Sequence, residues 1–165
     1  MGRLAANPVE KITVSKSLPS VLYGANSMGG TVNIITDEYI NGHGFEADLR
    51  GGDRYYHGSA KYTGEFNFLK WKLSLNYTNS DGYSLPSNFN KTDNENGGKR
   101  DNSGFEEKSL FFKLYADISE DFHLSFTEMI IDDEKYVPGD IYTDFPRYWR
   151  FPEWGGSLQN LSYLW

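Results

Sequence analysis

The chain has 165 residues, a formal net charge of −7 and no cysteine, which is the size of one ordinary domain. The acidic balance argues against a nucleic-acid partner, because phosphate binding needs clustered Lys and Arg. The lack of cysteine excludes disulfide frameworks and thiolate metal sites. An aromatic content of 16% together with Gly 17 favours many strands joined by turns, so an all-β fold class is predicted.

The first predicted unit covers residues 9–36. Residues 9–14 alternate as a short strand, and a turn with a proline follows. A glycine-rich stretch over 21–30 then leads into a second β-rich run at 31–35. Residues 37–44 are expected to form a connector.

From Phe45 onward, a period of two predicts a series of antiparallel strands with one apolar and one polar face. The expected strands are 45–50, 56–63, 70–78, 110–118 and 122–126, followed by a weaker sixth over 156–165. The pattern of the fifth strand loses phase near Met129 to Ile131.

The connections alternate in length. Short turns at 64–67 and 119–121 alternate with long segments at 81–107 and 132–152, although the connection at 51–54 is short. This alternation, with strands of about ten residues, is typical of an outer-membrane barrel. Aromatic residues near strand ends are expected to form interfacial girdles at the headgroup level. Core packing in a soluble sandwich explains these residues equally well. They are Tyr55, Tyr56, Tyr62, Phe66, Phe68, Trp71, Tyr77 and Tyr83.

Several elements occur in order within residues 9–36: an acidic-basic pair, a proline turn, Tyr-Gly, Gly-Gly, and an apolar strand that contains asparagine. The residues are Glu10, Lys11, Pro19, Tyr23, Gly24, Gly29, Gly30 and Asn33. In this order and spacing they resemble the end of the plug domain of TonB-dependent outer-membrane receptors. Lys11 stands where an arginine is common in that family, and Ser17 where a glycine is usual.

The resemblance implies two domains. Residues 1–40 would be the C-terminal part of the plug domain and its connector, and residues 41–165 the first six or so strands of an incomplete antiparallel transmembrane β-barrel. The N-terminus carries no signal-peptide pattern, so either the protein is cytoplasmic or its true start lies upstream, and the resemblance implies an upstream start. An open sheet would expose unpaired edges to lipid, so the isolated chain is expected to aggregate.

The function implied by the resemblance is energised uptake of a scarce ligand, with iron-siderophore complexes as the commonest substrate class. The implied partners are TonB, through a segment upstream of this chain, outer-membrane lipid, and a small-molecule ligand such as a metal chelate. The implied location is the bacterial cell outer membrane. Two alternatives stay open: a soluble all-β carbohydrate-binding module and a passive porin-like channel.

Aromatic residues near the second long segment suggest a ligand vestibule, with loop packing as the alternative: Tyr136, Tyr142, Tyr148, Trp149 and Trp154. The three histidines lie on separate elements, so neither a metal site nor a cofactor is predicted. The acidic stretches 93–96 and 132–134 lack EF-hand spacing and are expected to be solvated loops. No catalytic constellation can be assigned, so the protein is not expected to be an enzyme.

Overall fold

The computed structural model describes residues 9–15, 31–36 and 42–164. It divides into two units, Met1–Ile40 and Asn41–Trp165, which are described separately. All regular secondary structure in the described ranges is strand, which confirms the predicted all-β fold class. The same ranges hold no helix of the length and apolar character that a membrane span needs.

The first unit contains an antiparallel pair of strands, β1 (Val9–Ser15) and β2 (Thr31–Thr36). Lys11 pairs with Ile35 and Thr13 with Asn33, and the register shifts between Val9 and Lys11. The first strand was predicted from the alternation of its sequence and the second from its β-rich composition.

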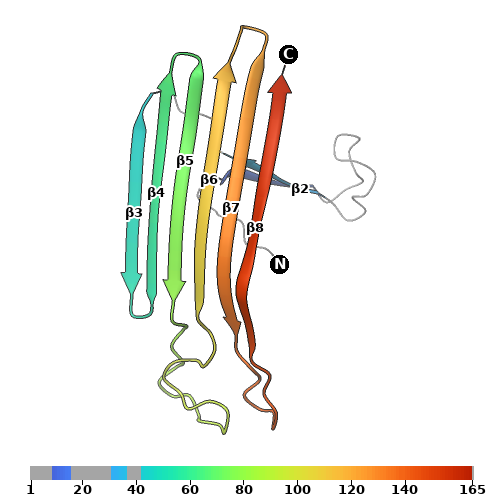
Figure 1. Cartoon of the computed structure of the whole chain (residues 1–165). Coiled ribbons are helices and arrows are strands. Elements are labelled where there is room, and N and C mark those ends of the chain that lie inside the picture. Colours follow the sequence, from blue (N-terminus) through green and yellow to red (C-terminus); the bar gives the residue numbers. More distant parts are fainter. Residues whose placement is uncertain (1–8, 16–30, 37–41, 165) are drawn as a thin grey trace. The chain divides into compact units, whose positions relative to one another are not determined.

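The second unit is a single open antiparallel sheet in which six strands follow one another in chain order (Figure 1). The strands are β3 (Gly44–Gly52), β4 (Tyr55–Phe66), β5 (Leu69–Ser80), β6 (Phe105–Asp117), β7 (His123–Val137) and β8 (Trp149–Leu164). Each strand pairs only with its sequence neighbours, as in a meander. The predicted number of strands in this part of the chain is therefore confirmed.

The connections fall into two groups at opposite ends of the sheet. The β4–β5 and β6–β7 turns lie at one end, whereas the β3–β4 turn and the segments 81–104 and 138–148 lie at the other (Figure 1). Asn67 in the β4–β5 turn has a φ of 54°, a left-handed conformation that asparagine tolerates better than most residues. The predicted alternation of short and long connections is confirmed.

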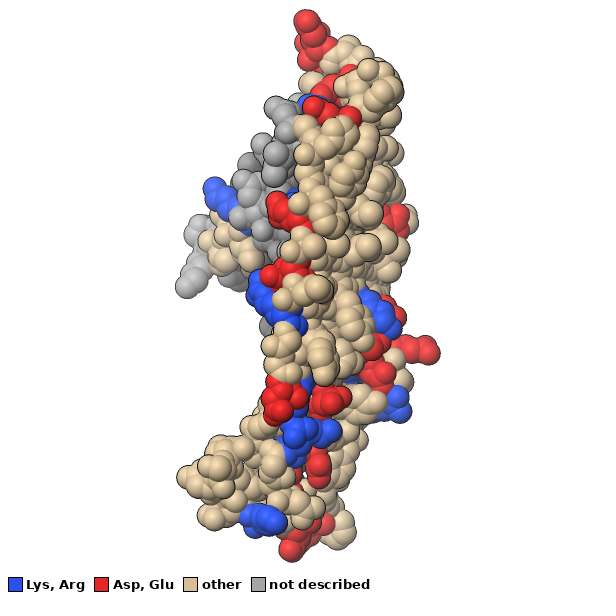
Figure 2. Space-filling model, turned by 90° about the vertical axis from the view of Figure 1, so that its left-hand side faces the viewer, with Lys and Arg blue, Asp and Glu red and all other residues tan. Residues whose placement is uncertain are grey.

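The cross-strand register places one set of apolar side chains on the same face of the sheet, called here the apolar face. Many of these side chains are open to solvent, among them Leu49 at 87% and Leu75 at 44%. Figure 2 shows charged side chains at both ends of the sheet, with the larger number in the half nearer the long loops. The apolar face consists of Phe45, Ala47, Leu49, Tyr56, Ala60, Tyr62, Phe66, Leu69, Trp71, Leu73, Leu75, Tyr77, Leu110, Phe112, Leu114, Ala116, Leu124, Phe126, Ile130, Leu161 and Tyr163.

The opposite face, called the polar face, carries hydrogen bonds and ion pairs between neighbouring strands. Nδ1 of His57 lies 3.0 Å from Oγ1 of Thr78, and Nδ2 of Asn76 donates to Oγ of Ser109 at 3.2 Å. Nζ of Lys70 lies 3.1 Å from Oδ2 of Asp117. Cross-strand polar pairs of this kind help to stabilise a sheet face, and the same face carries Phe111, whose side chain is 1% exposed.

Gly64 shows why one position on the apolar face cannot carry a side chain. It pairs with Trp71, and a Cβ at Gly64 would lie 2.5 Å from the indole ring. The glycine therefore lets the tryptophan ring lie over the neighbouring backbone, which covers a position that glycine would otherwise leave bare.

Two sequence-based expectations need correction. The eighth strand begins at Trp149 rather than near Gly156, and β7 continues to Val137, so the long segment expected at 132–152 shortens to 138–148. The loss of alternation near Met129 to Ile131 does not interrupt the strand, because the pairing of β7 with β6 runs through it without a register shift. Glu128 is a polar residue on the apolar face, and Met129 and Ile131 are apolar residues on the polar face.

Candidate functional site

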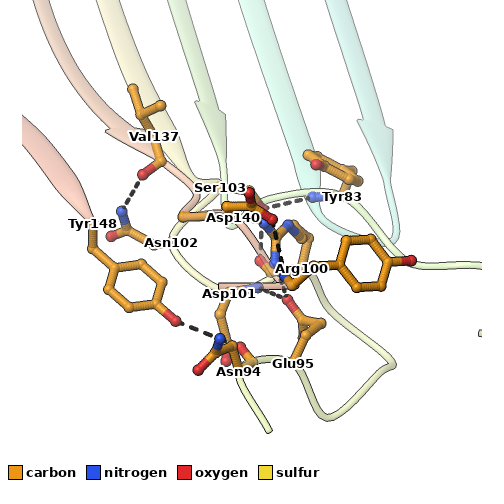
Figure 3. Close-up of polar contacts among 12 residues, drawn as sticks. Tyr83, Asn94, Glu95, Arg100, Asp101, Asn102, Ser103, Val137, Asp140 and Tyr148 are labelled. Atoms are coloured by element: carbon orange, nitrogen blue, oxygen red, sulfur yellow. Dashed lines mark hydrogen bonds and ion pairs between the residues drawn. The ribbon is translucent and has the colours of Figure 1, made fainter. Parts of the chain in front are cut away.

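The two long loops, 81–104 and 138–148, contact each other and are called here the loop cap (Figure 3). The first loop folds back on itself: Leu85 donates from its backbone N–H to the carbonyl of Gly98 at 2.6 Å, and Arg100 to that of Tyr83 at 2.9 Å. The reversal uses Gly97 and Gly98, whose φ values of 83° and 76° suit glycine.

A buried ion pair within the first loop also contacts the second loop. Nη1 of Arg100 lies 2.6 Å from Oε2 of Glu95, whose side chain is 1% exposed. The other terminal nitrogen of Arg100 donates to the backbone carbonyl of Gly139 in the second loop. The planar guanidinium can serve both acceptors at once, which a lysine ammonium on its flexible stem would do poorly.

The electrostatics of this pair favour the charged forms. Burial by itself would raise the pKa of Glu95, but hydrogen bonds from Arg100 and from the N–H of Asp101 outweigh it and hold the pKa below its ordinary value. Burial would likewise lower the pKa of Arg100, and the hydrogen bond to Glu95 holds it above its ordinary value instead. Both groups therefore remain ionised at neutral pH.

Asparagine side chains add further connections between the loops and to the sheet. Nδ2 of Asn94 donates to the carbonyl of Thr143 at 2.5 Å, and the hydroxyl of Tyr148 reaches the carbonyl of Asn94 at 3.5 Å. Nδ2 of Asn102 donates to the carbonyls of Val137 and Trp149, at 2.7 and 3.1 Å. Asn102 thus holds together the ends of β7 and β8, where the second loop leaves the sheet (Figure 3).

The tip of the second loop presents aromatic rings to solvent beside a polar pocket. Tyr142 and Phe145 are 85% and 86% exposed. The pocket between the two loops has a volume of about 420 Å³ and is lined by Thr92, Asp93, Asn94, Ile141, Tyr142, Thr143 and Asp144. Its lining offers two carboxylates, an amide and hydroxyls but no Lys or Arg, so it suits a hydroxylated or cationic group better than an anion.

The structure brings together only some of the five aromatic residues predicted to line a vestibule. Tyr142 lines the pocket of the loop cap, and Tyr148 is bonded to Asn94, another residue of that pocket. Trp149 and Trp154 lie on the polar face, since they pair with Val137 and Asp133, and the ring of Trp154 packs 5.2 Å from that of Phe151.

Tyr136 lies on the opposite face of the sheet from the two tryptophans. It pairs with Arg150, whose guanidinium carbon lies 5.1 Å from the centre of the tyrosine ring. Both side chains bond Oε1 of Glu134, the tyrosine hydroxyl at 2.6 Å and Nη2 of the arginine at 2.6 Å. This rim cluster of Glu134, Tyr136 and Arg150 continues the apolar face toward the loop cap.

The residues of the plug-like motif are only partly described. Glu10 and Lys11 lie in β1, where the pairing is irregular around Glu10, and Asn33 lies in β2 opposite Thr13. The remaining motif positions, Pro19, Tyr23, Gly24, Gly29 and Gly30, lie outside the described residues.

The expectation that the acidic stretches 93–96 and 132–134 are solvated loops is wrong for 132–134 and for Glu95 within 93–96. Asp132, Asp133 and Glu134 belong to β7, and Glu95 is almost fully buried in its pair with Arg100. The described part of the chain contains no group of three or more His, Asp or Glu side chains that could hold a metal ion.

Sequence reasoning did not predict the contacts of Arg100 with Glu95 and with the carbonyl of Gly139 in the loop cap. The available signal was the pair Gly97-Gly98, which predicts a reversal that brings Glu95 and Arg100 together. The partner carbonyl at Gly139 lies 39 positions beyond Arg100, and no local pattern indicates such a contact.

Comparison of the chain with protein-family models, with curated protein sequences and with solved structures gives no significant match. The functional argument therefore rests on the residues and the geometry of the chain.

Proposed function

We propose that the six-stranded sheet is part of the wall of a bacterial outer-membrane β-barrel, with its apolar face toward lipid. The observation that carries this proposal is the exposed apolar face. Contiguous apolar patches on soluble monomers seldom exceed a few hundred Å², yet here the apolar side chains cover five successive cross-strand rows, from Leu69 to Tyr77 on β5. Such a face needs either lipid or a protein partner to cover it.

The dimensions of the strands support the membrane setting. A tilted strand crosses the hydrocarbon layer with about 9–11 residues, and β4, β5 and β6 have 12, 12 and 13. On β5 the apolar side chains from Leu69 to Tyr77 extend over about 27 Å at a rise of about 3.4 Å per residue. That length suits the apolar band of about 25 Å that such barrels present to lipid.

Aromatic side chains bound the apolar face at both ends. Phe66 and Trp71 lie toward the short turns, and Tyr56 and Tyr77 toward the loop cap. These positions suit interfacial girdles, because the rings are amphipathic and favour the headgroup level. Beyond the second girdle, the hydroxyl of Tyr77 donates to Glu106 at 2.9 Å, so polar pairing begins where the lipid headgroups would lie.

Among outer-membrane barrels, we assign the chain to the TonB-dependent receptors as the best-supported class. The support is the ordered plug-like motif in residues 9–36 directly before the sheet. In this proposal the loop cap is extracellular and its pocket contacts the ligand, an iron-siderophore complex being the expected substrate class. TonB energises transport through a segment of the complete receptor, and further strands pair with β3 and β8, because unpaired edges in lipid cost several kcal/mol per group.

The orientation can be tested by labelling with a maleimide that does not cross membranes. Because residues 1–165 contain no cysteine, each introduced thiol is the only target within this part of the receptor. Tyr142→Cys in the loop cap should be labelled in intact cells, and Glu120→Cys in the β6–β7 turn only after the outer membrane is permeabilised. Recovery of the protein in the soluble fraction would refute the proposal and favour the soluble carbohydrate-binding module.

The transport mechanism needs a second test. Uptake of an iron-siderophore complex by cells that depend on this receptor should stop when TonB is deleted, while the receptor remains in the outer membrane. Uptake that persists without TonB and increases linearly with concentration would favour the passive porin-like channel instead.

A further inference from the structure

One asparagine of the loop cap lies directly before the reversal of the first loop. Asn96 follows the buried Glu95 and precedes Gly97 and Gly98, whose φ values of 83° and 76° are left-handed. The sequence Asn-Gly occurs at 41–42 and at 96–97, and 96–97 is the pair that the structure describes in full. The Asn96 side chain is exposed, so water reaches its amide.

An asparagine that precedes glycine can lose ammonia without an enzyme. The backbone nitrogen of the glycine gives up its proton to solvent and attacks Cγ of the asparagine. The carbon–nitrogen bond of the side-chain amide then breaks, and ammonia leaves with a proton from solvent. Water opens the resulting cyclic imide at either carbonyl, which gives aspartate or isoaspartate. Glycine favours the reaction because it has no Cβ to hinder the attack and its backbone turns freely.

The surroundings of Asn96 leave room for the cyclic imide. A Cβ at Gly98 would meet no atom within 4 Å, and one at Gly97 would lie 3.7 Å from the nearest atom, on the ring of Phe89. Among the described residues, no hydrogen bond fixes the Asn96 side chain. Asn94 lies in a different setting, because its side chain donates to the carbonyl of Thr143 and the residue that follows it carries a Cβ.

The backbone N–H of Gly97 restrains the reaction in the closed cap. Although burial would raise the pKa of Glu95, hydrogen bonds from Arg100 and from the backbone N–H groups of Asp101 and Gly97 hold that pKa below its ordinary value. The nitrogen that must attack Asn96 is therefore held by a carboxylate, whose negative charge opposes loss of the proton. The reaction proceeds when the cap opens locally and this hydrogen bond is broken.

We propose that Asn96 is a site of spontaneous deamidation, and that the modification opens the loop cap. Isoaspartate carries the chain through its side chain, which lengthens the backbone between Glu95 and Gly97 by a methylene group. Aspartate adds a negative charge next to Glu95, which repels its carboxylate. Either product weakens the pair of Glu95 with Arg100, which connects the first loop to Gly139. The inference goes beyond the proposed function, since it needs only water and holds whether or not the sheet lies in lipid.

The site can be tested by ageing the complete folded protein at neutral pH and digesting it with trypsin, with fresh protein as the baseline. Cleavage after Lys91 and Lys99 releases residues 92–99, which contain both Asn94 and Asn96. Fragment spectra should locate the conversion of amide to acid at Asn96, as a mixture of aspartate and isoaspartate that increases over days, while Asn94 stays unchanged. No conversion at Asn96, or equal conversion at Asn94, would overturn the proposal.

A second measurement tests the effect on the loop cap. In the modified fraction, the amide of Leu85, bonded to Gly98 within the cap, should lose protection from hydrogen exchange. Asn96→Gln is the matched control, because the longer side chain of glutamine cyclises far more slowly, so Leu85 should keep its protection on ageing. Unchanged protection of Leu85 in the modified wild-type protein would overturn the proposed opening of the cap.

The restraint by the closed cap gives a third test. Replacing Arg100 by methionine increases the open population, so the conversion of Asn96 should become several times faster. Arg50→Met alters an exposed ion pair of β3 and should leave the conversion at the wild-type rate. Equal rates in the wild type and in Arg100→Met would overturn the role assigned to the N–H of Gly97.

Discussion

The ion pair of the loop cap offers a prediction that can be worked out in detail. Replacing Arg100 by methionine keeps much of the apolar stem and removes the guanidinium, which bonds both Glu95 and the carbonyl of Gly139. The Glu95 carboxylate would then be left at a site where its side chain is 1% exposed. We expect the two loops to separate more often while the sheet remains folded.

The size of the effect follows from what Glu95 retains. Removal of one partner from a fully buried ion pair costs about 3–5 kcal/mol. Here the N–H of Asp101 still donates to the carboxylate at 3.0 Å, and the cap is only a loop thick, so water reaches the carboxylate after a small opening. We therefore expect a loss of about 2 kcal/mol, which increases the open population about 30-fold.

Hydrogen exchange measures this opening directly. The amide of Leu85, bonded to Gly98 within the cap, should exchange about 30-fold faster in Arg100→Met. Arg50→Met is the matched control, because the side chains of its ion pair with Asp48 are 70% and 44% exposed, and such a surface pair should contribute less than about 1 kcal/mol. Equal protection of Leu85 in wild type and Arg100→Met would refute the role of the pair.

The same pair predicts a dependence on pH. Because the folded-state pKa of Glu95 lies below its ordinary value of 4.5, the stabilisation is complete above that value and is lost as the pH falls through the folded-state pKa. After correction for intrinsic exchange rates, protection of Leu85 should be constant near neutrality and decline only in the acidic range. Arg100→Met should show a smaller decline, since its Glu95 has lost the partner.

Three further substitutions test the sheet and the base of the cap. Leu75→Arg, in the middle of the apolar face, should lower the free energy of unfolding in a bilayer by about 2–4 kcal/mol, whereas Tyr56→Arg near the rim should lower it by about 0–1 kcal/mol. Equal losses for the two variants in a urea titration would contradict a lipid-facing centre. Asn102→Ala removes two hydrogen bonds and places alanine at a φ of 51°, so limited proteolysis should cut the second loop faster. Asn102→Gly also removes the hydrogen bonds but tolerates this φ, so its loss of stability should be smaller than that of Asn102→Ala by about 1 kcal/mol. Gly64→Ala must displace the ring of Trp71 and should cost about 1–3 kcal/mol, and an unchanged unfolding midpoint would show that the ring moves freely.

Much of the sheet could be predicted from the sequence because its determinants are local. Successive side chains of a strand point to opposite faces, so the alternation around Trp71, Leu73 and Leu75 indicates both a strand and its apolar face. The turns could be placed because glycine, asparagine and aspartate interrupt that alternation. Strand ends were less certain: β8 begins at Trp149 because its pairing with Val137 extends the ladder beyond the alternating residues.

The interpretation of Met129 to Ile131 shows where local pattern stops being informative. Because the polar Glu128 is followed by the apolar Met129, Ile130 and Ile131, the sequence alone does not show which of these side chains share a face. The continuous pairing of Phe112 with Glu128 shows that the strand keeps its register, so the carboxylate really lies on the apolar face. That distinction depends on the neighbouring strand, and no single-strand pattern contains it.

The sequence by itself determined the all-β class, the six strands of the second unit, the two faces and the alternation of short and long connections, because period-two patterning and turn chemistry act over a few residues. Only the tertiary structure decided which distant residues meet. Arg100 donates a hydrogen bond to the carbonyl of Gly139, Glu128 accepts one from Gln159, and Tyr136 lies on the opposite face from Trp149. These outcomes follow from cross-strand register and loop packing, where the partner of each polar group is set by the whole sheet and not by its own segment.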